Sequence, residues 1–540
     1  MGNDLIQVVN QPTSKGYELL NSIVTNTSGN VYGFWPYVPA DTIAAAMARL
    51  SRSPDDLRVN LLLEFSNEIK HLDRIQQLSR EVDRNKTNNL MKRVLTAYGD
   101  DSVQQLLPIQ LVVENTSNIM TKTIEWHRLG AYLEQSTRYI FFDQKINGHY
   151  RYHTPEELSE SDKIYYQSVM DQVFDNYSAL VTKLTQYIRD KNPKPIDKGE
   201  YLAWVAATRA QACDSARPLL PVATTSTVGI VANAQTIEYM ITSLISNQLI
   251  EAQKLGLSIL KEVRKIYPVF FERVDMPSRG LTTSAYKSQI SMNLEQLAHE
   301  LKFPKSPNDK SVRLINVWPN FEEIYSKILF EYTQADSISL KSITDQYDSE
   351  SSERLWEAFI GKRMNRRHKP GKALEIIHYE WEIIGDYGTF RDLQRHRMVD
   401  DMRWQKLSPE LGYDVPELVI EAGLESIFRE TNELSHQLYN YLEETQNQSI
   451  AQYACLLANK IRYRFVINAR SLTHLLEIRT TPQGHPGYRK ICQEMYSQVM
   501  KSTPEIAKMM RFVSQDEDPE LTRLASEQAT VKKLKELTEQ

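Results

Sequence analysis

Apolar residues recur at helical spacing through most of the chain. Leucine, isoleucine and tyrosine stand three or four positions apart in residues 161–190, 236–266 and 424–446, and this period predicts amphipathic helices there. Two shorter runs differ: PIQLVVEN (108–115) and IIHYEWEII (376–384) are rich in β-branched and aromatic residues with partial alternation, which predicts strands. The chain is therefore expected to be mostly helical, with a small amount of sheet.

Both predicted strands lead on to a short segment that contains His-Arg. WHR at 126–128 follows the first strand, and RHR at 395–397 follows the second. A further pair of motifs keeps a common interval, because Arg217 and Gln452 each stand 16 positions before an Asn-Ala dipeptide. The same elements in the same order indicate a tandem duplication.

The duplication divides the chain into two predicted domains. A chain of 540 residues is long enough for two to four ordinary domains. The turn- and breaker-rich sequences DMPSRG and FPKSPNDK place the join within 275–310. We therefore expect a first domain over residues 1–290 and a second over residues 291–540.

Bulk composition narrows the classes of function. The net charge is −5 and the pI is near 6.2, so the whole protein is not a generic polyanion binder. Three cysteines lie far apart without a CxxC pair, which argues against a disulfide framework or a structural zinc site. No apolar run approaches the roughly 18–20 residues that span a bilayer, and MGNDLI lacks a signal-peptide core. We expect a soluble cytoplasmic protein with no membrane association.

The segment WHRLGAYLEQSTRY (126–139) contains few apolar residues. If it is helical, His127, Ala131, Glu134 and Arg138 share one face, and that face is mostly polar. Such a face meets either water or a ligand. Taken alone, Glu134 and Arg138 could also form an ordinary surface pair, and His127 could be a core histidine bonded to backbone.

This segment resembles the signature of the flavin-dependent thymidylate synthases. The family pattern runs Arg-His-Arg, two residues, Ser, one residue, Asn-Glu, one residue, Ser, one residue, Arg-Tyr. The matching positions are His127, Arg128, Glu134, Ser136, Arg138 and Tyr139, and the departures are Trp126, Ala131 and Leu133. ARPLLP at 216–221 is similar to the family's Ala-Arg-x-x-Leu-Pro.

The second half resembles the other part of the family pattern. RHR at 395–397 keeps the opening triplet, and NARSLTHLLEIR at 468–479 is close to a family helix that begins Asn-Ala-Arg-Ser-Leu. The first half has Gln235 and Leu244 where the second has Arg470 and Arg479. Because the losses in the two halves are complementary, we expect one composite site to which both halves contribute.

The resemblance implies an α+β fold of two thymidylate synthase-like domains, mostly helical around small sheets. It also implies roles for individual residues. Arginine forks match phosphate oxygens, and a cation beside a base carbonyl stabilises developing negative charge. The implied catalytic residues are Arg479, Ser136 and Arg138. The implied substrate-binding residues are Glu134, Ser136, Arg138, Tyr139, Arg217 and Arg479. The implied cofactor-binding residues are Arg395, His396, Arg397, Asn468, Arg470, His474, His127 and Arg128.

The implied activity is an FAD-dependent methyl transfer to C5 of dUMP or a related pyrimidine nucleotide. In the family, reduced FAD works with NADPH and with methylenetetrahydrofolate as one-carbon donor, and the active sites are assembled from the subunits of a homotetramer. A tandem chain would then form a homodimer equivalent to that tetramer. The resemblance implies neither a metal nor a nucleic-acid partner.

Two features leave alternatives open. The family usually carries Glu-His before the strand, whereas this chain reads VQQLL (103–107) and ALEII (373–377) in those regions. A different one-carbon donor, a different pyrimidine, or flavin and nucleotide binding without turnover are therefore alternatives. The basic run GKRMNRRHKPGK (361–372) could contact a flavin pyrophosphate or a folate tail, or could be a solvated loop.

Overall fold

A computed structural model describes residues 11–538 apart from 51–52, 70–71, 73–74, 76–83, 100, 147, 302, 304–310 and 518–523. The fold is α+β, with 60% helix and small antiparallel sheets, which confirms the predicted fold class. Among the described residues, no helix combines the length and the apolar character that crossing a membrane requires. All three cysteines are buried and unbonded to one another.

The chain forms two compact units, and each is built from separated segments. Unit 1 contains Met1–Val181, Leu219–Lys305 and Ser426–Leu456, whereas unit 2 contains Thr182–Pro218, Ser306–Glu425 and Leu457–Gln540. Each half of the sequence therefore contributes one segment to the unit that is formed mainly by the other half. The predicted boundary at residue 290 falls inside α12 (Gly280–Leu301), and the division into duplicated domains at that point stays a prediction.

The sheet of unit 1 has four antiparallel strands. Their order is β1 (Val31–Gly33), β2 (Pro108–Ser117), β4 (Thr225–Asn233) and β3 (Gly130–Glu134). The predicted strand at 108–115 is confirmed as the greater part of β2. Alternating β-branched and apolar side chains let β2 and β4 pair at the centre of this sheet.

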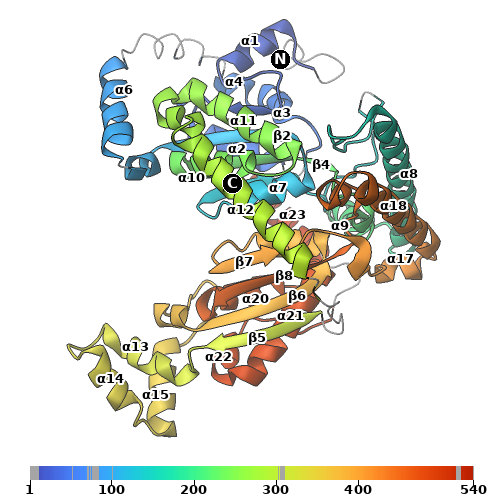
Figure 1. Ribbon diagram of the computed structural model, residues 1–540. Helices are drawn as coiled ribbons and strands as arrows, with labels where there is room; N and C mark the ends of the chain where they lie inside the picture. The colour runs from blue at the N-terminus through green and yellow to red at the C-terminus, as the bar shows by residue number, and fades with distance from the viewer. Residues whose placement is uncertain are drawn as a thin grey trace. The chain divides into compact units, whose positions relative to one another are not determined.

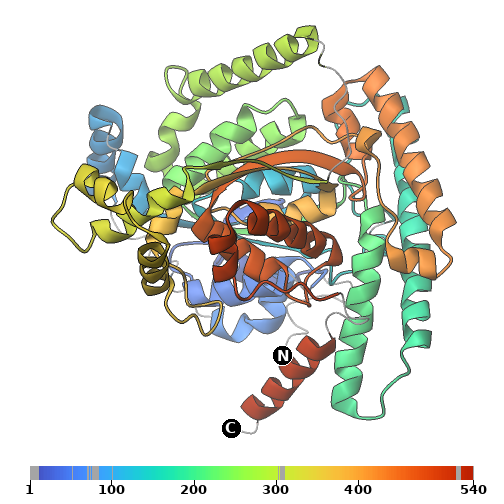
Figure 2. The same ribbon diagram turned by 90° about the horizontal axis from the view of Figure 1, so that it is seen from below.

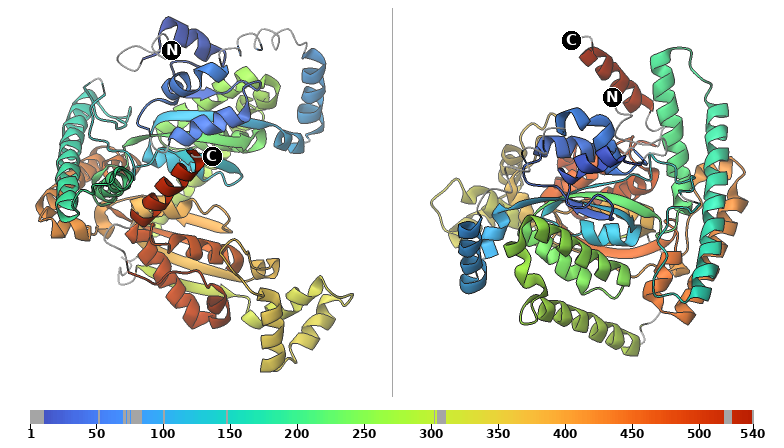
Figure 3. Two further views of the ribbon diagram at one scale, coloured as in Figure 1. Left: turned by 180° about the vertical axis from the view of Figure 1, so that it is seen from behind. Right: turned by 90° about the horizontal axis from the view of Figure 1, so that it is seen from above.

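Helices cover both faces of this sheet (Figure 3). On one face, α2 (Ala40–Leu50) packs so closely that a Cβ on Gly229 of β4 would approach Met47 Sδ to 3.0 Å. On the other face lie α10 (Ala234–Ile245) and α11 (Ile250–Ile266). Because both faces are covered, nearly every side chain of β4 is buried.

The sheet of unit 2 repeats this topology. Its order is β5 (Val312–Trp318), β6 (His378–Asp386), β8 (Lys460–Asn468) and β7 (Asp401–Trp404), again wholly antiparallel. The predicted strand at 376–384 is confirmed as β6 with a shift of two residues. The two strands predicted from the sequence, β2 and β6, hold the same second place in their sheets. A duplication predicts this arrangement.

Unit 2 covers one face of its sheet with α16 (Tyr387–Gln394), α20 (Ala469–Arg479) and α21 (Pro486–Ser502), and Figure 2 shows α21 from this side. The opposite face carries ion pairs between strands, including Arg462 with Glu382 at 2.8 Å. Arg479, the catalytic candidate of the second half, is the last residue of α20 and so belongs to the helices on the covered face.

A group of three short helices lies at one end of unit 2 (Figure 1). These are α13 (Ile324–Phe330), α14 (Ser337–Thr344) and α15 (Ser349–Ile360). Other described helices of moderate or short length are α1 (Ser14–Asn21), α3 (Leu57–Glu64), α4 (Ser66–Ile69), α6 (Asn85–Lys92), α7 (Asn118–Glu125), α17 (Glu417–Glu421), α19 (Gln448–Ala451), α22 (Pro504–Met509) and α23 (Leu524–Thr538).

The long predicted helices are present. Residues 161–190 and 424–446 form α8 (Glu160–Lys191) and α18 (Glu425–Thr445), and α9 (Lys198–Ala216) follows α8. Within unit 1, α18 lies along the first part of α8 (Figure 3), where Asn176 donates to Thr431 at 3.0 Å. The helical prediction over 236–266 is confirmed by α10 and α11, which are separated by a short break where the Asn247 side chain accepts from the backbone N–H of Leu249.

Candidate functional site

Arg479 is the last residue of α20 and lies at the centre of a polar cluster in unit 2. Its Nε donates to His396 Nε2 at 2.7 Å, and its Nη2 donates to the backbone oxygen of Asp392 at 2.7 Å. The guanidinium also lies 5.1 Å above the ring centre of Tyr488, within the range of a cation–π contact. These contacts hold the arginine in one orientation.

The carboxylate of Asp392 joins this cluster to Arg217, which comes from the first half of the sequence. Arg217 Nη2 donates to Asp392 Oδ2 at 3.1 Å, and Arg395 Nη1 lies 3.7 Å from Oδ1. Arg217 and Asp392 are both buried. Sequence reasoning missed Asp392, although its place three residues before Arg395 on a helix was a usable signal.

His396 is an uncharged acceptor in this cluster. Burial lowers the pKa of His396 well below its usual range, and the nearby cations Arg479, Arg397 and Arg395 lower it further, together with His474. A neutral imidazole can accept from the Arg479 guanidinium, whereas an imidazolium cannot.

His474 extends the cluster along α20. Lys369 Nζ donates to His474 Nδ1 at 2.8 Å, and the rings of His474 and His396 have centres 6.1 Å apart. Burial, followed by Lys369 and nearby arginines, lowers the pKa of His474. Lys369 belongs to the basic run at 361–372, so part of that run lies at the candidate site.

Another residue of the basic run has a structural contact instead. Arg363 is buried and pairs with Glu477 at 2.7 Å, and it also donates to the backbone oxygen of Met509 at 2.7 Å. The run is therefore neither uniformly a binding surface nor a fully solvated loop.

The hydrogen bonds of Asn468 and Arg470 have counterparts at the matching positions of the first half. The Asn468 side chain caps α20 by accepting from Ser471 N at 2.9 Å, and Asn233 caps α10 in the same way. Such caps explain the repeated Asn-Ala dipeptide through local structure. Arg470 Nη1 donates to Glu375 at 2.9 Å.

In the first half, a hydrogen bond between two amide side chains corresponds to the Arg470–Glu375 ion pair. Gln105 Nε2 donates to Gln235 Oε1 at 3.0 Å, at the positions that match Glu375 and Arg470 in the duplicated topology. An ion pair in unit 2 thus corresponds to an amide pair in unit 1. Arg397 belongs to the same triplet as His396, and its backbone N–H donates to the Arg395 oxygen at 3.1 Å.

The segment 126–139 lies in unit 1 and is not helical. Trp126 closes α7, and β3 begins at Gly130, so the predicted single helical face does not form. His127 Nδ1 lies 3.0 Å from the backbone oxygen of Ile124, while Arg128 is exposed. The helix ends there because strand pairing of residues 130–134 with β4 takes over the backbone hydrogen bonds.

Glu134 is buried in an ion pair at the end of β3. Lys122 Nζ donates to Glu134 at 3.0 Å and to Glu125 at 2.5 Å, and all three side chains are at most 5% exposed. Sequence reasoning missed Lys122 and Glu125. Beyond Glu134, Ser136 Oγ accepts from the backbone N–H of Arg138 at 3.2 Å, and Tyr139 N donates to the Ser136 backbone oxygen.

The structure therefore brings together part of the predicted site. Unit 2 contains a contiguous cluster of Arg217, Arg395, His396, His474 and Arg479, in which Arg217 joins residues of the second half. His127 to Tyr139 belong to unit 1. Their participation in a composite site stays a prediction.

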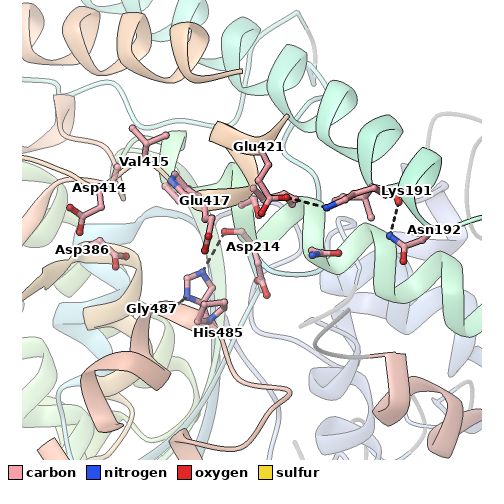
Figure 4. Close-up of a pocket in the computed structure, with 18 residues that line it drawn as sticks. Lys191, Asn192, Asp214, Asp386, Asp414, Val415, Glu417, Glu421, His485 and Gly487 are labelled. Carbon is pink, nitrogen blue, oxygen red and sulfur yellow. Dashed lines mark hydrogen bonds and ion pairs between the residues drawn. The ribbon is translucent and has the colours of Figure 1, made fainter. Parts of the chain in front are cut away.

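Unit 2 also contains a cavity of about 510 Å³ (Figure 4). Its lining includes Ile188, Val415 and Leu418, and five carboxylate residues: Asp214, Asp386, Asp414, Glu417 and Glu421. Lys191 in the lining already pairs with Glu421 at 3.2 Å. An excess of carboxylates disfavours an anionic ligand, so a nucleotide phosphate is better matched by the arginine cluster than by this cavity.

The cluster around His396 fits the anionic part of a flavin nucleotide by charge. Lys369, Arg395, Arg397 and Arg470 supply cationic groups there, and Arg397 and Arg395 are among the charged neighbours that lower the pKa of His396. Guanidinium and ammonium groups are the usual partners of pyrophosphate oxygens. The donor set therefore suits such a cofactor.

The model of the thymidylate synthase complementing protein family matches residues 36–269 and again residues 313–505. The chain belongs to the flavin-dependent thymidylate synthase family. The two separate matches follow the two halves, in keeping with a tandem duplication of the family domain.

Two relatives illustrate the range of similarity within the family. The chain is 32% identical over 521 residues to a UPF0159 protein of Chlamydia pneumoniae, covering 95% of this chain and 97% of the relative. It is 22% identical over 199 residues to the flavin-dependent thymidylate synthase of Clostridium tetani, covering 37% of this chain and 74% of that enzyme. The similarity to the Chlamydia relative extends along nearly the whole of both chains, while the Clostridium enzyme aligns with one part of this chain.

Two solved structures are similar to parts of the chain. One is a UMP/dUMP methylase from Streptomyces cacaoi bound with 5-Br dUMP, with 16% identity, a TM-score of 0.29, and coverage of 37% of this chain and 94% of that chain. The other is a flavin-dependent thymidylate synthase from Helicobacter pylori complexed with FAD and dUMP, with 17% identity, a TM-score of 0.28, and coverage of 38% and 100%.

Proposed function

We propose that the protein is an FAD-dependent methyltransferase that acts at C5 of dUMP or a related pyrimidine nucleotide. The observation that carries the proposal is the orientation of Arg479 by His396 and Asp392 in a cluster of cations. A guanidinium held in this way is preorganised to stabilise negative charge on a base carbonyl. Membership of a flavin-dependent family supports the choice of cofactor.

In this proposal, FAD is held by Arg395, His396, Arg397, Arg470 and His474, with His127 and Arg128 as further candidates. When bound in its reduced form, FAD supplies the hydride for the methyl group. Methylenetetrahydrofolate would provide the carbon, the C5 proton of the base would leave to solvent, and NADPH would return the flavin to its reduced form. Arg479, Ser136 and Arg138 are the proposed catalytic residues.

Substrate binding is assigned to arginines and their neighbours. Arg217 and Arg138 are proposed for the phosphate, and Glu134, Ser136 and Tyr139 complete the proposed set. The protein is proposed to act as a cytoplasmic homodimer equivalent to the tetramer of the resembling enzymes.

The assay is release of tritium from C5-labelled dUMP in the presence of FAD, NADPH and methylenetetrahydrofolate. Release that depends on NADPH and methylenetetrahydrofolate, together with a flavin absorbance spectrum of the purified protein, is the expected result. Arg403→Leu is the matched control for arginine substitutions, because Arg403 is exposed on β7 and pairs with Asp401. A flavin spectrum without tritium release under these conditions contradicts the thymidylate assignment.

A second candidate is a homologue that uses another one-carbon donor or binds flavin and nucleotide without turnover. It is favoured by the absence of the family's Glu-His histidine before the strand. The two histidines nearest that position in the sequence have other hydrogen-bond partners. His378 Nδ1 lies 2.9 Å from Asp400, and His368 Nδ1 accepts from Met364 N at 3.2 Å. Substituting other folate or one-carbon donors in the same assay separates the two candidates.

A further inference from the structure

Asp392 lies among arginines from three separate segments of the chain. Its side chain accepts from Arg217 at 3.1 Å and lies 3.7 Å from Arg395, while its backbone oxygen accepts from Arg479 at 2.7 Å. The Arg217 and Asp392 side chains are only 4% and 6% exposed. Within unit 2, Asp392 therefore accepts hydrogen bonds from two arginines and lies within 4 Å of a third.

A second carboxylate lies close to the same guanidinium. Asp386 caps α16, and Gly388 lies between it and Arg217: a Cβ on Gly388 would be 3.1 Å from Asp386 Oδ1 and 3.6 Å from Arg217 Nη2. Both carboxylates therefore interact electrostatically with the Arg217 guanidinium. A phosphate that approaches Arg217 must compete with Asp392 for the donor and is repelled by its charge.

The duplicated fold itself does not require this ion pair. Unit 1 has Thr123 and Gln452 at the positions that match Asp392 and Arg217, and both are neutral. Thr123 Oγ1 donates to the Ile119 oxygen at 3.1 Å, and Gln452 Nε2 donates to the Ser449 oxygen at 3.4 Å. Because the same topology forms in unit 1 with two neutral residues that each bond to a nearby backbone oxygen, the charged pair points to the site rather than to the scaffold.

We infer that Asp392 sets the anion affinity of the arginine cluster by competing with the phosphate group of the ligand. Its carboxylate holds Arg217 in place until a phosphate monoester displaces it. Displacing the Asp392 carboxylate from Arg217 weakens the binding of inorganic phosphate, which makes no other contacts. A nucleotide offsets this loss with further contacts through its base and sugar. Asp392 is thus a specificity-determining residue that selects phosphate carried on a larger molecule. The identity of that larger molecule rests on the proposed function.

The experiment compares Asp392→Asn with wild type and with Asp400→Asn by isothermal titration calorimetry. Asp400 is a control because its substitution removes the same charge from unit 2 at a residue that pairs with His378. The probes are inorganic phosphate, dUMP and uncharged deoxyuridine. Asp392→Asn should bind inorganic phosphate about tenfold more tightly than wild type, because one like charge beside the anion is removed. Asp400→Asn should bind phosphate as wild type does.

Deoxyuridine binding should be equal in all three proteins, since it carries no phosphate to compete with Asp392. A purely structural Asp392 predicts unchanged or weaker phosphate binding in Asp392→Asn, and that result overturns the inference. An equal gain in Asp400→Asn also overturns it, because the effect would then be one of overall charge. If Asp392→Asn does not fold by circular dichroism, Asp392→Ser takes its place with the same expected gain.

A different combination of assay results is expected if the proposed function is wrong but Asp392 does compete with phosphate. Absent tritium release or absent dUMP binding, together with tighter inorganic phosphate binding by Asp392→Asn, contradicts the thymidylate assignment and supports the role of Asp392. Asp392→Glu keeps the charge and should bind inorganic phosphate as weakly as wild type. Strong phosphate binding by Asp392→Glu would contradict competition by the carboxylate.

Discussion

Arg479 Nε donates to His396 Nε2 at 2.7 Å. This hydrogen bond requires a neutral imidazole as the acceptor, so the orientation of the guanidinium depends on the protonation state of His396. Burial and surrounding cations lower the pKa of His396. The contact joins the end of α20 to the Arg-His-Arg triplet, two motifs that stand 83 positions apart. It makes the geometry of the candidate catalytic arginine sensitive to pH.

The first prediction concerns stability in acid. The unfolded chain takes up a proton on His396 near its ordinary pKa of about 6.5, whereas the folded chain does not until a lower pH. The unfolded state therefore binds more protons in this window, and the free energy of unfolding falls as the pH drops below about 6.5. His396→Gln should show a shallower fall in urea titrations between pH 5 and 8. Equal slopes for the variant and wild type would contradict a depressed His396 pKa.

Substituting Arg479 tests its catalytic role. Arg479→Leu introduces the residue that the first half has at the matching position, Leu244, so α20 should still form. Loss of a preorganised cation should lower tritium release by about 100-fold or more, with flavin absorbance retained. Arg403→Leu should leave release unchanged. Full activity in Arg479→Leu would remove this residue from the catalytic set.

The pair Arg470 and Glu375 can be exchanged for its counterpart in the first half. Arg470→Gln combined with Glu375→Gln reproduces the amide pair of Gln235 and Gln105. Because an exposed ion pair contributes about 0–1 kcal/mol, the free energy of unfolding should change by less than about 1 kcal/mol. Flavin affinity, measured by fluorescence quenching, should fall if Arg470 binds the cofactor. An unstable double variant would show that the two halves are not equivalent here.

Lys122 compensates two buried carboxylates in unit 1. Lys122→Met should destabilise the protein by about 3–5 kcal/mol at neutral pH, because Glu125 and Glu134 remain buried without a cation.

The control for this prediction is Lys163→Met. Lys163 pairs with Glu160 at 2.9 Å on the more exposed surface of α8, where an ion pair contributes about 0–1 kcal/mol. Urea denaturation at pH 7 measures the free energy of unfolding of both variants. An equally small loss in Lys122→Met and Lys163→Met would contradict the assignment of the loss to buried carboxylates.

The central strands β4 and β8 could have been predicted and were not. TSTVGIVAN and KIRYRFVIN are rich in β-branched and aromatic residues, as the two predicted strands are. Short apolar runs of this kind are ambiguous between a buried strand and a helical segment. The short strands β3 and β7 carry a weaker signal, because their backbone pairs only through the distant strands β4 and β8.

The sequence by itself determined the long helices α8 and α18, the strands β2 and β6, the family motifs and the evidence of duplication in their intervals. These features are local periods and spacings, which are readable without knowing what packs against them. The tertiary structure alone decided that Arg217 meets Asp392, 175 positions away, and that Lys122 neutralises Glu134. Such contacts depend on which segments share a compact unit, and here residues 182–218 join the unit of the second half. Burial then requires each charge to find a partner, and only the folded chain specifies which one.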